Sequence, residues 1–165
     1  MTWSRLLATF FGAGLLRPAP GTWGTLAALP AAWALHVLGG FWLLAAGTVV
    51  VSVLGWWVTV SETREQEDPD PSEIVIDEVA GMWLALWPVS LGAMMMGASV
   101  TALWPGWVVA FLAFRVFDIT KLGPVGWADR MHTPLGVMLD DLIAGLFAAI
   151  VVVAAAALAH GVLMG

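Results

Sequence analysis

Three long stretches of the chain carry no charged side chain. No Lys, Arg, Asp or Glu occurs between Arg17 and Glu62, between Glu78 and Arg115, or after Asp141. A membrane-spanning helix needs about 20 apolar residues, so these stretches have room for roughly two, two and one spans. Only 11% of the 165 residues are charged, against about 25% in an ordinary soluble domain. The sequence therefore predicts an integral membrane protein.

We expect a single domain, residues 1–165, folded as an all-α bundle of about five transmembrane helices. Pro30 and Pro88 should bend the first and third spans. The opening residues, "MTWSRLLATFFGAGLL", are typical of a short interfacial helix, although they also imitate a signal peptide. Cysteine is absent, which excludes disulfides and thiolate metal sites. The expected spans cover residues 22–38, 41–60, 79–97, 102–117 and 140–159.

Threading five spans through a membrane puts every charged residue on one side. The N-terminus, residues 61–78 and residues 118–139 then share that side, and the C-terminus lies on the other. All six Lys and Arg on one side make that side cytoplasmic. The acid-rich stretch 62–73 should be a solvated, mobile loop. The net charge of −6 comes mostly from this loop and does not indicate a nucleic-acid binder. The apolar helices should hold acyl chains nearby, so we expect membrane lipids as partners.

Two pairs of adjacent acids precede apolar runs, in "IVIDEVAGMW" and "VMLDDLIAGLF". The pairs are Asp77-Glu78 and Asp140-Asp141, and in each case a glycine follows four residues after one of the acids. Adjacent carboxylates repel each other unless a cation lies between them. A helix-start dipole contributes under about 1 kcal/mol and would favour one acid rather than two pairs. The pattern predicts a shared divalent cation, and all-oxygen ligands favour Mg²⁺.

Basic residues are concentrated in "FRVFDITKLGPVGWADRMH", residues 114–132. Arg115, Asp118 and Lys121 are spaced by three, so on a helix they share one side. This spacing is also typical of a simple salt-bridge ladder at a membrane interface. Arg130 and His132 follow in a loop. Basic groups beside an acid-bound cation are typical of phosphoryl chemistry, where both stabilise the charge that shifts in the transition state.

A glycine-rich turn, "RPAPGTWGT" at residues 17–25, leads into the first span. Backbone N–H groups at such a helix start suit a phosphate. A capped helix with tight-turn glycines, in which Thr22 is the cap, is the alternative. The candidate phosphate-binding residues are Gly21, Thr22, Gly24 and Thr25.

The motifs "PGTWGTL", "IVIDEVAGMW", "FRVFDITK" and "LDDLIAG", in this order, resemble those of the phosphatidylglycerophosphatase A family. The resemblance runs from about Phe11 to Ala149. It implies a Mg²⁺-dependent phosphatase of the bacterial inner membrane, which removes the terminal phosphate of phosphatidylglycerophosphate and leaves phosphatidylglycerol. The family usually has Pro directly after the motif lysine. Here Lys121 is followed by Leu122 and Gly123, and we expect Pro124 to supply that turn.

Combining the motifs with this chemistry leads to a mechanistic hypothesis. Water attacks phosphorus directly, with an aspartyl-phosphate intermediate as the competing route. His132 or a water molecule protonates the leaving glycerol oxygen, and Asp118 is a further cation ligand or a supporting group. The residues of the hypothesis are Asp77, Glu78, Asp140 and Asp141 for Mg²⁺; Arg115, Lys121 and Arg130 for phosphate oxygens; and Asp77, Asp118, Asp141 and His132 for catalysis.

Two other classes of membrane protein deserve comparison. A small ion-coupled transporter also places acids at membrane edges, but its path needs polar groups through the whole depth of the bilayer. The expected helices carry almost none beyond their cytoplasmic ends. A lipid phosphotransferase that joins two alcohols would show an Asp-Gly-rich signature, which is not found in this sequence.

Overall fold

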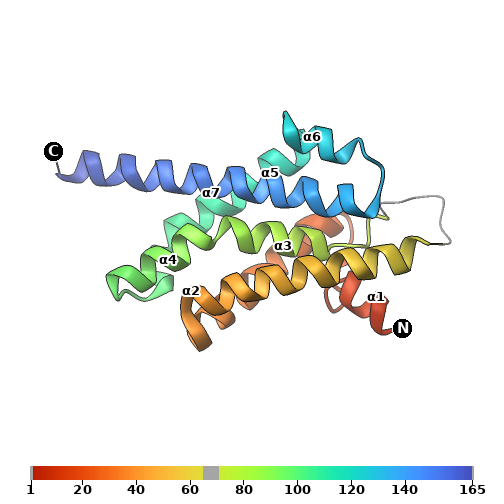
Figure 1. Ribbon diagram of the computed structural model, residues 1–165. Coiled ribbons are helices and arrows are strands. Elements are labelled where there is room, and N and C mark those ends of the chain that lie inside the picture. Colours follow the sequence, from red (N-terminus) through yellow and green to blue (C-terminus); the bar gives the residue numbers. More distant parts are fainter. Residues whose placement is uncertain (1, 65–70, 165) are drawn as a thin grey trace.

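The computed structural model describes residues 2–64 and 71–164, and these residues form helices joined by short turns (Figure 1). No strand occurs in the described ranges, so the all-α prediction is confirmed. The elements are α1 (Trp3–Ala8), η1 (Ala13–Leu15), α2 (Pro20–Thr63), α3 (Ile76–Ala85), α4 (Trp87–Met96), η2 (Val100–Leu103), α5 (Trp104–Thr120), α6 (Pro124–Asp129) and α7 (Pro134–Met164).

Helix α2 is two antiparallel halves joined at Gly39-Gly40, where the backbone leaves the helical region. Gly40 has a φ of 64°, which a residue without a β-carbon adopts at little cost. The two halves pack against each other. At one point of contact, a β-carbon on Gly47 would lie 3.0 Å from the side chain of Leu35. In Figure 1 the two arms of this hairpin lie along the bundle. They correspond to the first two expected spans.

Helices α3 and α4 form the third span and meet at Leu86, two residues before Pro88. Helix α3 lies at the centre of the bundle, since it packs against α2, α5 and α7. Its side chain Trp83 donates its indole N–H to the carbonyl of Ala28 at 2.9 Å. This contact fixes α3 against the first half of α2.

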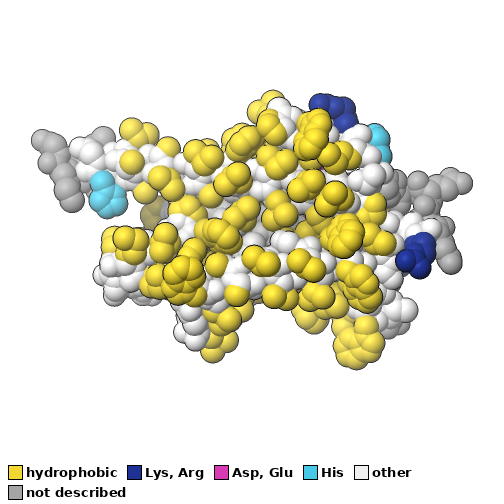
Figure 2. All heavy atoms as spheres, viewed as in Figure 1, with side chains coloured by type: hydrophobic (Ala, Val, Ile, Leu, Met, Phe, Trp, Pro, Cys, Tyr) yellow, Lys and Arg dark blue, Asp and Glu magenta, His cyan; other side chains and the backbone are white. Residues whose placement is uncertain are grey.

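Four helical segments among the described residues are long and apolar enough to cross a membrane. One of them is the α2 hairpin, so the segments agree with the expectation of about five spans. Figure 2 shows a face covered by hydrophobic side chains, while the Lys and Arg visible on it lie at the end that holds α1 and α6. The segments are Pro20–Thr63, Ile76–Met96, Val100–Thr120 and Pro134–Gly161.

The N-terminal segment is tied to the ends of α2 and α3. Helix α1 matches the expected interfacial helix, with Trp3 83% exposed. Glu73 accepts from Arg5 at 2.6 Å and from Arg17 at 3.4 Å, and Ser4 donates to Glu62. The prediction of a solvated loop over 62–73 is therefore wrong at Glu62 and Thr63, which belong to α2. Glu73 lies outside the helices and is held by its two ion pairs, and residues 65–70 lie outside the described residues.

Several expected helix starts are wrong by a few residues, among them that of α3, which begins at Ile76 rather than at residue 79. Helix α7 begins at Pro134 rather than Asp140, because Thr133 caps it by accepting from the N–H of Gly136 at 3.1 Å. The Asp140-Asp141 pair consequently lies in the second turn, beyond the reach of the helix-start dipole. Helix α2 begins at Pro20 after Ala19, without a side-chain cap. Capping by Thr22 is thus wrong as well.

Polar side chains within the apolar layer satisfy one another. His36 Nδ1 lies 2.7 Å from Ser90 Oγ. Trp87 donates its indole N–H to Thr48 Oγ1 at 3.1 Å, and Thr48 donates to the carbonyl of Leu44. Pairing of this kind is required where water is excluded. These contacts join α2 to α4 and hold the hairpin against the third span.

Candidate active site

Three carboxylates from two helices meet at one end of the bundle. Asp77 and Glu78 lie in the first turn of α3, and Asp141 lies on α7. Each offers one oxygen, and these oxygens lie within 4.8 Å of one another. Asp77 and Asp141 are only 5% and 3% exposed. We call Asp77, Glu78 and Asp141 the acid cluster.

Two oxygens of the acid cluster are buried without a hydrogen-bond partner. They are Glu78 Oε2 and Asp141 Oδ1. An ionised carboxylate removed from water costs several kcal/mol unless a cation or donor replaces the lost hydration. Three carboxylates are a donor set that suits Mg²⁺ or Mn²⁺, whose remaining ligands are water or phosphate. The residues present therefore fit a divalent cation.

Small residues allow α3 and α7 to approach closely enough to form the acid cluster. A β-carbon on Gly81 would lie 2.5 Å from the carbonyl oxygen of Asp141 and 2.6 Å from the ring of Phe114. No side chain fits in that space. Gly81 lies one turn after Asp77, so the close approach brings the two aspartates to the same level.

Asp140 points to a different partner from its neighbour. Its Oδ2 lies 2.5 Å from Nζ of Lys121, which also lies 3.2 Å from Asp118 and 3.6 Å from Asp129. Burial lowers the pKa of Lys121, but the charges of Asp141, Asp140 and Asp118 outweigh burial and raise it above its ordinary value. These carboxylates favour the charged form of Lys121. The role of Asp140 as a cation ligand stays a prediction.

Arg115 joins α5 to the start of α2. It forms an ion pair with Asp118 and lies within hydrogen-bonding distance of Thr22 Oγ1, at 3.4 Å, and Thr25 Oγ1, at 3.5 Å. A β-carbon on Gly21 would lie 2.3 Å from Glu78 Oε1 and 3.5 Å from Arg115 Nη1. The predicted ladder along α5 is present, and it also contacts other helices.

The predicted phosphate cradle is smaller than expected. Only the first N–H groups of a helix lack an intrahelical acceptor, and Trp23 already donates its N–H to the carbonyl of Ala19 at 3.1 Å. This leaves the N–H groups of Gly21 and Thr22. Gly24 instead allows close packing, because a β-carbon there would lie 2.6 Å from that of Val75.

Two predicted residues lie on the surface of the protein. Arg130 and His132 are exposed, at and after the end of α6. Among the described residues, no ion pair or side-chain hydrogen bond joins either of them to the other predicted residues. The expected turn at Pro124 is present, since α6 begins there after Gly123 with a φ of 56°.

Segments that are far apart in the sequence thus meet at one end of the bundle. The start of α2, the first turn of α3, the end of α5 and the second turn of α7 supply acids, paired cations and free N–H groups. These features define a polytopic α-helical membrane protein with a buried acidic site. The family model for phosphatidylglycerophosphatase A matches residues 6–156. The chain belongs to this family, which confirms the resemblance of its motifs.

Relatives in three bacteria support this membership. A phosphatidylglycerophosphatase A of Haemophilus influenzae is 35% identical over 151 residues, 90% of this chain and 86% of the relative. One of Escherichia coli is 35% identical over 147 residues, 87% and 78% of the two chains. A Bacteroides thetaiotaomicron protein, provisionally named phosphatidylinositol-3-phosphatase, is 33% identical over 155 residues, 91% of each. No solved structure matches the chain significantly. The family supports an enzyme over a transporter.

Proposed function

We propose that this protein hydrolyses the terminal phosphomonoester of phosphatidylglycerophosphate in a Mg²⁺-dependent reaction, releasing phosphate and phosphatidylglycerol. Family membership and the names of two relatives support the substrate. The pair of unpartnered buried oxygens, Glu78 Oε2 and Asp141 Oδ1, is the observation that carries the metal dependence. Both belong to the acid cluster, and a divalent cation would satisfy both at once.

The acid cluster of Asp77, Glu78 and Asp141 would hold Mg²⁺. When bound, the ion would polarise the phosphoryl group and offset its charge. Asp140 would keep the ammonium of Lys121 in place rather than contact the cation, because their atoms lie 2.5 Å apart. The ammonium of Lys121 is needed there, because without a cation the carboxylates would repel the negative charge of a phosphate.

Arg115 and Lys121, the cations beside the acids, would bind the phosphate oxygens. The guanidinium is oriented by Asp118 on its own helix and by the two threonines of α2. Donors held in place beforehand stabilise developing charge without reorganising. A water molecule would attack phosphorus and lose one proton, and the bond from phosphorus to the glycerol oxygen would break. That oxygen would take up one proton, so the net products are phosphate and the free hydroxyl of phosphatidylglycerol.

The site would face the cytoplasm of a bacterial inner membrane, with the C-terminus on the opposite side. When the spans are threaded through a membrane, all six Lys and Arg would lie on one side. Positive residues favour the cytoplasmic side. In that orientation the acid cluster, in the first turn of α3 and the second turn of α7, would lie near the depth of lipid headgroups. A phosphate on a lipid would therefore reach the site without leaving the membrane.

The test is phosphate release by the purified protein in lipid vesicles, with Mg²⁺ or with a chelator. Asp77→Asn and Asp141→Asn should each abolish turnover, whereas Glu62→Gln, a carboxylate at the end of α2 bonded to Ser4, should not. Turnover by a well-folded Asp77→Asn or Asp141→Asn protein at the wild-type rate would remove that residue from the cation site. Full activity in chelator would remove the metal from the mechanism.

The name of the Bacteroides relative suggests a second substrate, phosphatidylinositol 3-phosphate. Both lipids present a phosphomonoester on a polyol, so the same cation and basic residues could bind either. The assay should therefore include both lipids in matched vesicles. We expect phosphatidylglycerophosphate to have the higher kcat/KM, and the opposite order would assign the second lipid as substrate.

A further inference from the structure

One face of α2 continues from the predicted headgroup site into the apolar layer. Thr22, Thr25, Leu29 and Trp33 are spaced by three, four and four residues, which places them along one side of a helix. Thr22 and Thr25 contact Arg115. Leu29 and Trp33, together with Pro30, line a cavity.

Helix α5 shows the same continuity. Trp104, Trp107, Phe111 and Arg115 are spaced by three, four and four residues, so they also share one side of a helix. Arg115 is at the headgroup end, and the two tryptophans line the same cavity as Trp33. The contact of Arg115 with the two threonines and the cavity are thus two ends of one line of side chains between α2 and α5. We call this line, which runs from Thr22 and Arg115 to Trp33 and Trp104, the seam.

The cavity has a volume of about 270 Å³ and an almost entirely apolar wall. Its largest polar group is already satisfied, because Trp107 donates its indole N–H to the carbonyl of Val100 at 3.1 Å. Its lining residues are Leu29, Pro30, Trp33, Thr101, Trp104 and Trp107.

The two helices of the seam make few direct backbone contacts. The first half of α2 and α5 both pack on α3, yet in the described residues they scarcely approach each other directly. Trp33 and Trp104 are exposed to the surroundings of the bundle. A lipid in the surrounding bilayer could therefore enter the seam from the side.

The depth of the cavity matches that of an acyl chain. At about 1.5 Å per residue, Trp33 lies about 12 Å along α2 from Thr25, and Trp104 lies about 16 Å along α5 from Arg115. One leaflet of the hydrocarbon core is about 15 Å thick. A lipid whose phosphate lies beside Arg115 would place its chain at this depth.

From these relationships we propose that the α2–α5 seam binds one acyl chain of the lipid substrate, with the tryptophan-lined cavity as the site of chain contact. The assignment rests on the proposed function, since it takes Arg115 as the phosphate end. Bulk lipid is as apolar as the cavity, so the hydrophobic effect does not drive the chain into it. The chain instead gains dispersion contacts with the fixed rings of the tryptophans. The seam would therefore favour long chains modestly.

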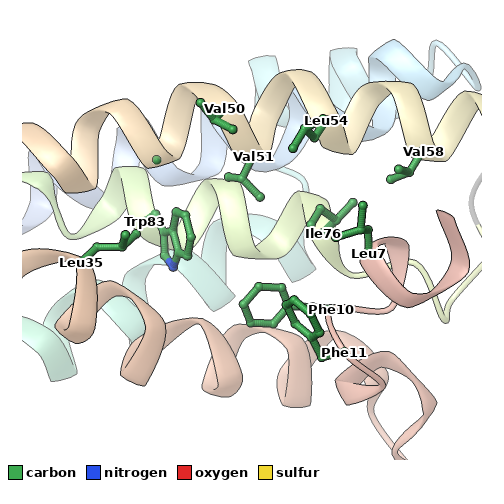
Figure 3. A pocket seen from close by; sticks show the side chains of 11 residues that line it. Leu7, Phe10, Phe11, Leu35, Val50, Val51, Leu54, Val58, Ile76 and Trp83 are labelled. Carbon is green, nitrogen blue, oxygen red and sulfur yellow. The ribbon is translucent and has the colours of Figure 1, made fainter. Parts of the chain in front are cut away.

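A second apolar pocket offers a control within the same protein. It lies between α1, both halves of α2 and α3, and Figure 3 shows Val50, Leu54 and Trp83 among its walls. None of its lining residues comes from α5 or α7, which carry Arg115 and Asp141. A chain in that pocket would not follow the seam to the headgroup site.

The experiment compares long-chain and short-chain substrates, dipalmitoyl and dihexanoyl phosphatidylglycerophosphate, in the same detergent micelles. Trp33→Ala removes one wall, and Thr101→Trp fills the cavity from an exposed position. Each should raise KM for the dipalmitoyl lipid by roughly three- to tenfold and leave the dihexanoyl lipid unchanged. The matched control is Trp56→Ala on the second half of α2, since Trp56 is 46% exposed and Trp33 is 45% exposed. Val50→Trp tests the second pocket.

The outcomes separate this inference from the proposed function. A dipalmitoyl-specific defect in Trp33→Ala and Thr101→Trp, with normal Trp56→Ala and Val50→Trp, supports the seam. Equal changes for both lipids, or the same defect in Trp56→Ala, overturn it even if phosphate is released normally. A defect confined to Val50→Trp would move the chain to the second pocket. If the wild-type protein cleaved neither lipid, the proposed function would fail first and the seam with it.

Discussion

Gly81 and Gly145 bring the backbones of α3 and α7 into contact. A β-carbon on Gly145 would lie 2.2 Å from the carbonyl oxygen of Gly81, a separation that real β-carbons do not show. Each glycine lies four residues after an aspartate of the acid cluster, Asp77 or Asp141. The crossing of the two helices thereby sets the distance between the carboxylates, and packing and chemistry depend on the same pair of residues.

The first prediction concerns this crossing. Gly145→Ala should force the helices apart, destabilise the protein by about 1–3 kcal/mol, and lower activity more than stability explains. Gly161→Ala is the matched control, because nothing lies within 4 Å of a β-carbon there. Thermal unfolding in detergent and phosphate release check both effects. A Gly145→Ala protein as stable and active as Gly161→Ala would show that the crossing is not required.

The second prediction concerns Lys121. Lys121→Met leaves Asp140, a buried carboxylate, without its cation. The cost should be about 1–3 kcal/mol, below that of a fully buried pair because the lysine is partly exposed. Turnover should also fall, while Lys121→Arg should retain most of the stability and part of the turnover. Wild-type stability of Lys121→Met would mean that Asp140 has another partner, with unfolding and steady-state kinetics as the measurements.

The third prediction separates charge from geometry at Arg115. Lysine keeps the charge but lacks the planar fork that reaches Asp118 on one helix and the two threonines on the other. Arg115→Lys should therefore lower kcat/KM by roughly ten- to hundredfold. A Thr22→Val, Thr25→Val double variant should show a smaller loss of the same kind. Kinetics indistinguishable from wild type for Arg115→Lys would exclude a positioning role for the fork.

The fourth prediction concerns His132, the general acid of the sequence hypothesis. Its exposed position after α6 does not hold it at the acid cluster. We expect His132→Gln to lower kcat less than tenfold, whereas loss of a general acid costs roughly 10²–10⁴-fold. A larger loss, together with a changed pH dependence of kcat, would restore the histidine to the mechanism.

The spans were predictable because their signals are local. Charge-free stretches fix the number of crossings, and Gly39-Gly40 marks the turn between the first two. The start of α7 could be predicted less well from charge, because the Asp140-Asp141 pair bounds the charge-free stretch and lies six residues after the helix begins. Thr133-Pro134, a common cap and first-turn pair, is the local signal for the true start.

The partners of the charged residues could be predicted only in part. The four motifs meet as expected, since helix ends on the same side of a small bundle lie close together. Which acid contacts which cation depends on the path of a short turn. Lys121 has a φ of 48°, and this conformation places its ammonium beside Asp140. Glu73 illustrates the same limit, because its arginine partners lie more than 50 positions away in the sequence.

The central claim is that Asp77, Glu78 and Asp141 together bind a divalent cation, and direct binding tests it best. Electron paramagnetic resonance of Mn²⁺ added to the purified protein in detergent reports bound ion without any substrate. We expect saturable Mn²⁺ binding, with Mg²⁺ displacing the bound ion. Glu78→Gln and Asp141→Asn should each weaken the binding severely, whereas Glu62→Gln should leave it intact. Binding of Mn²⁺ by both cluster variants as tightly as by the wild type would contradict it.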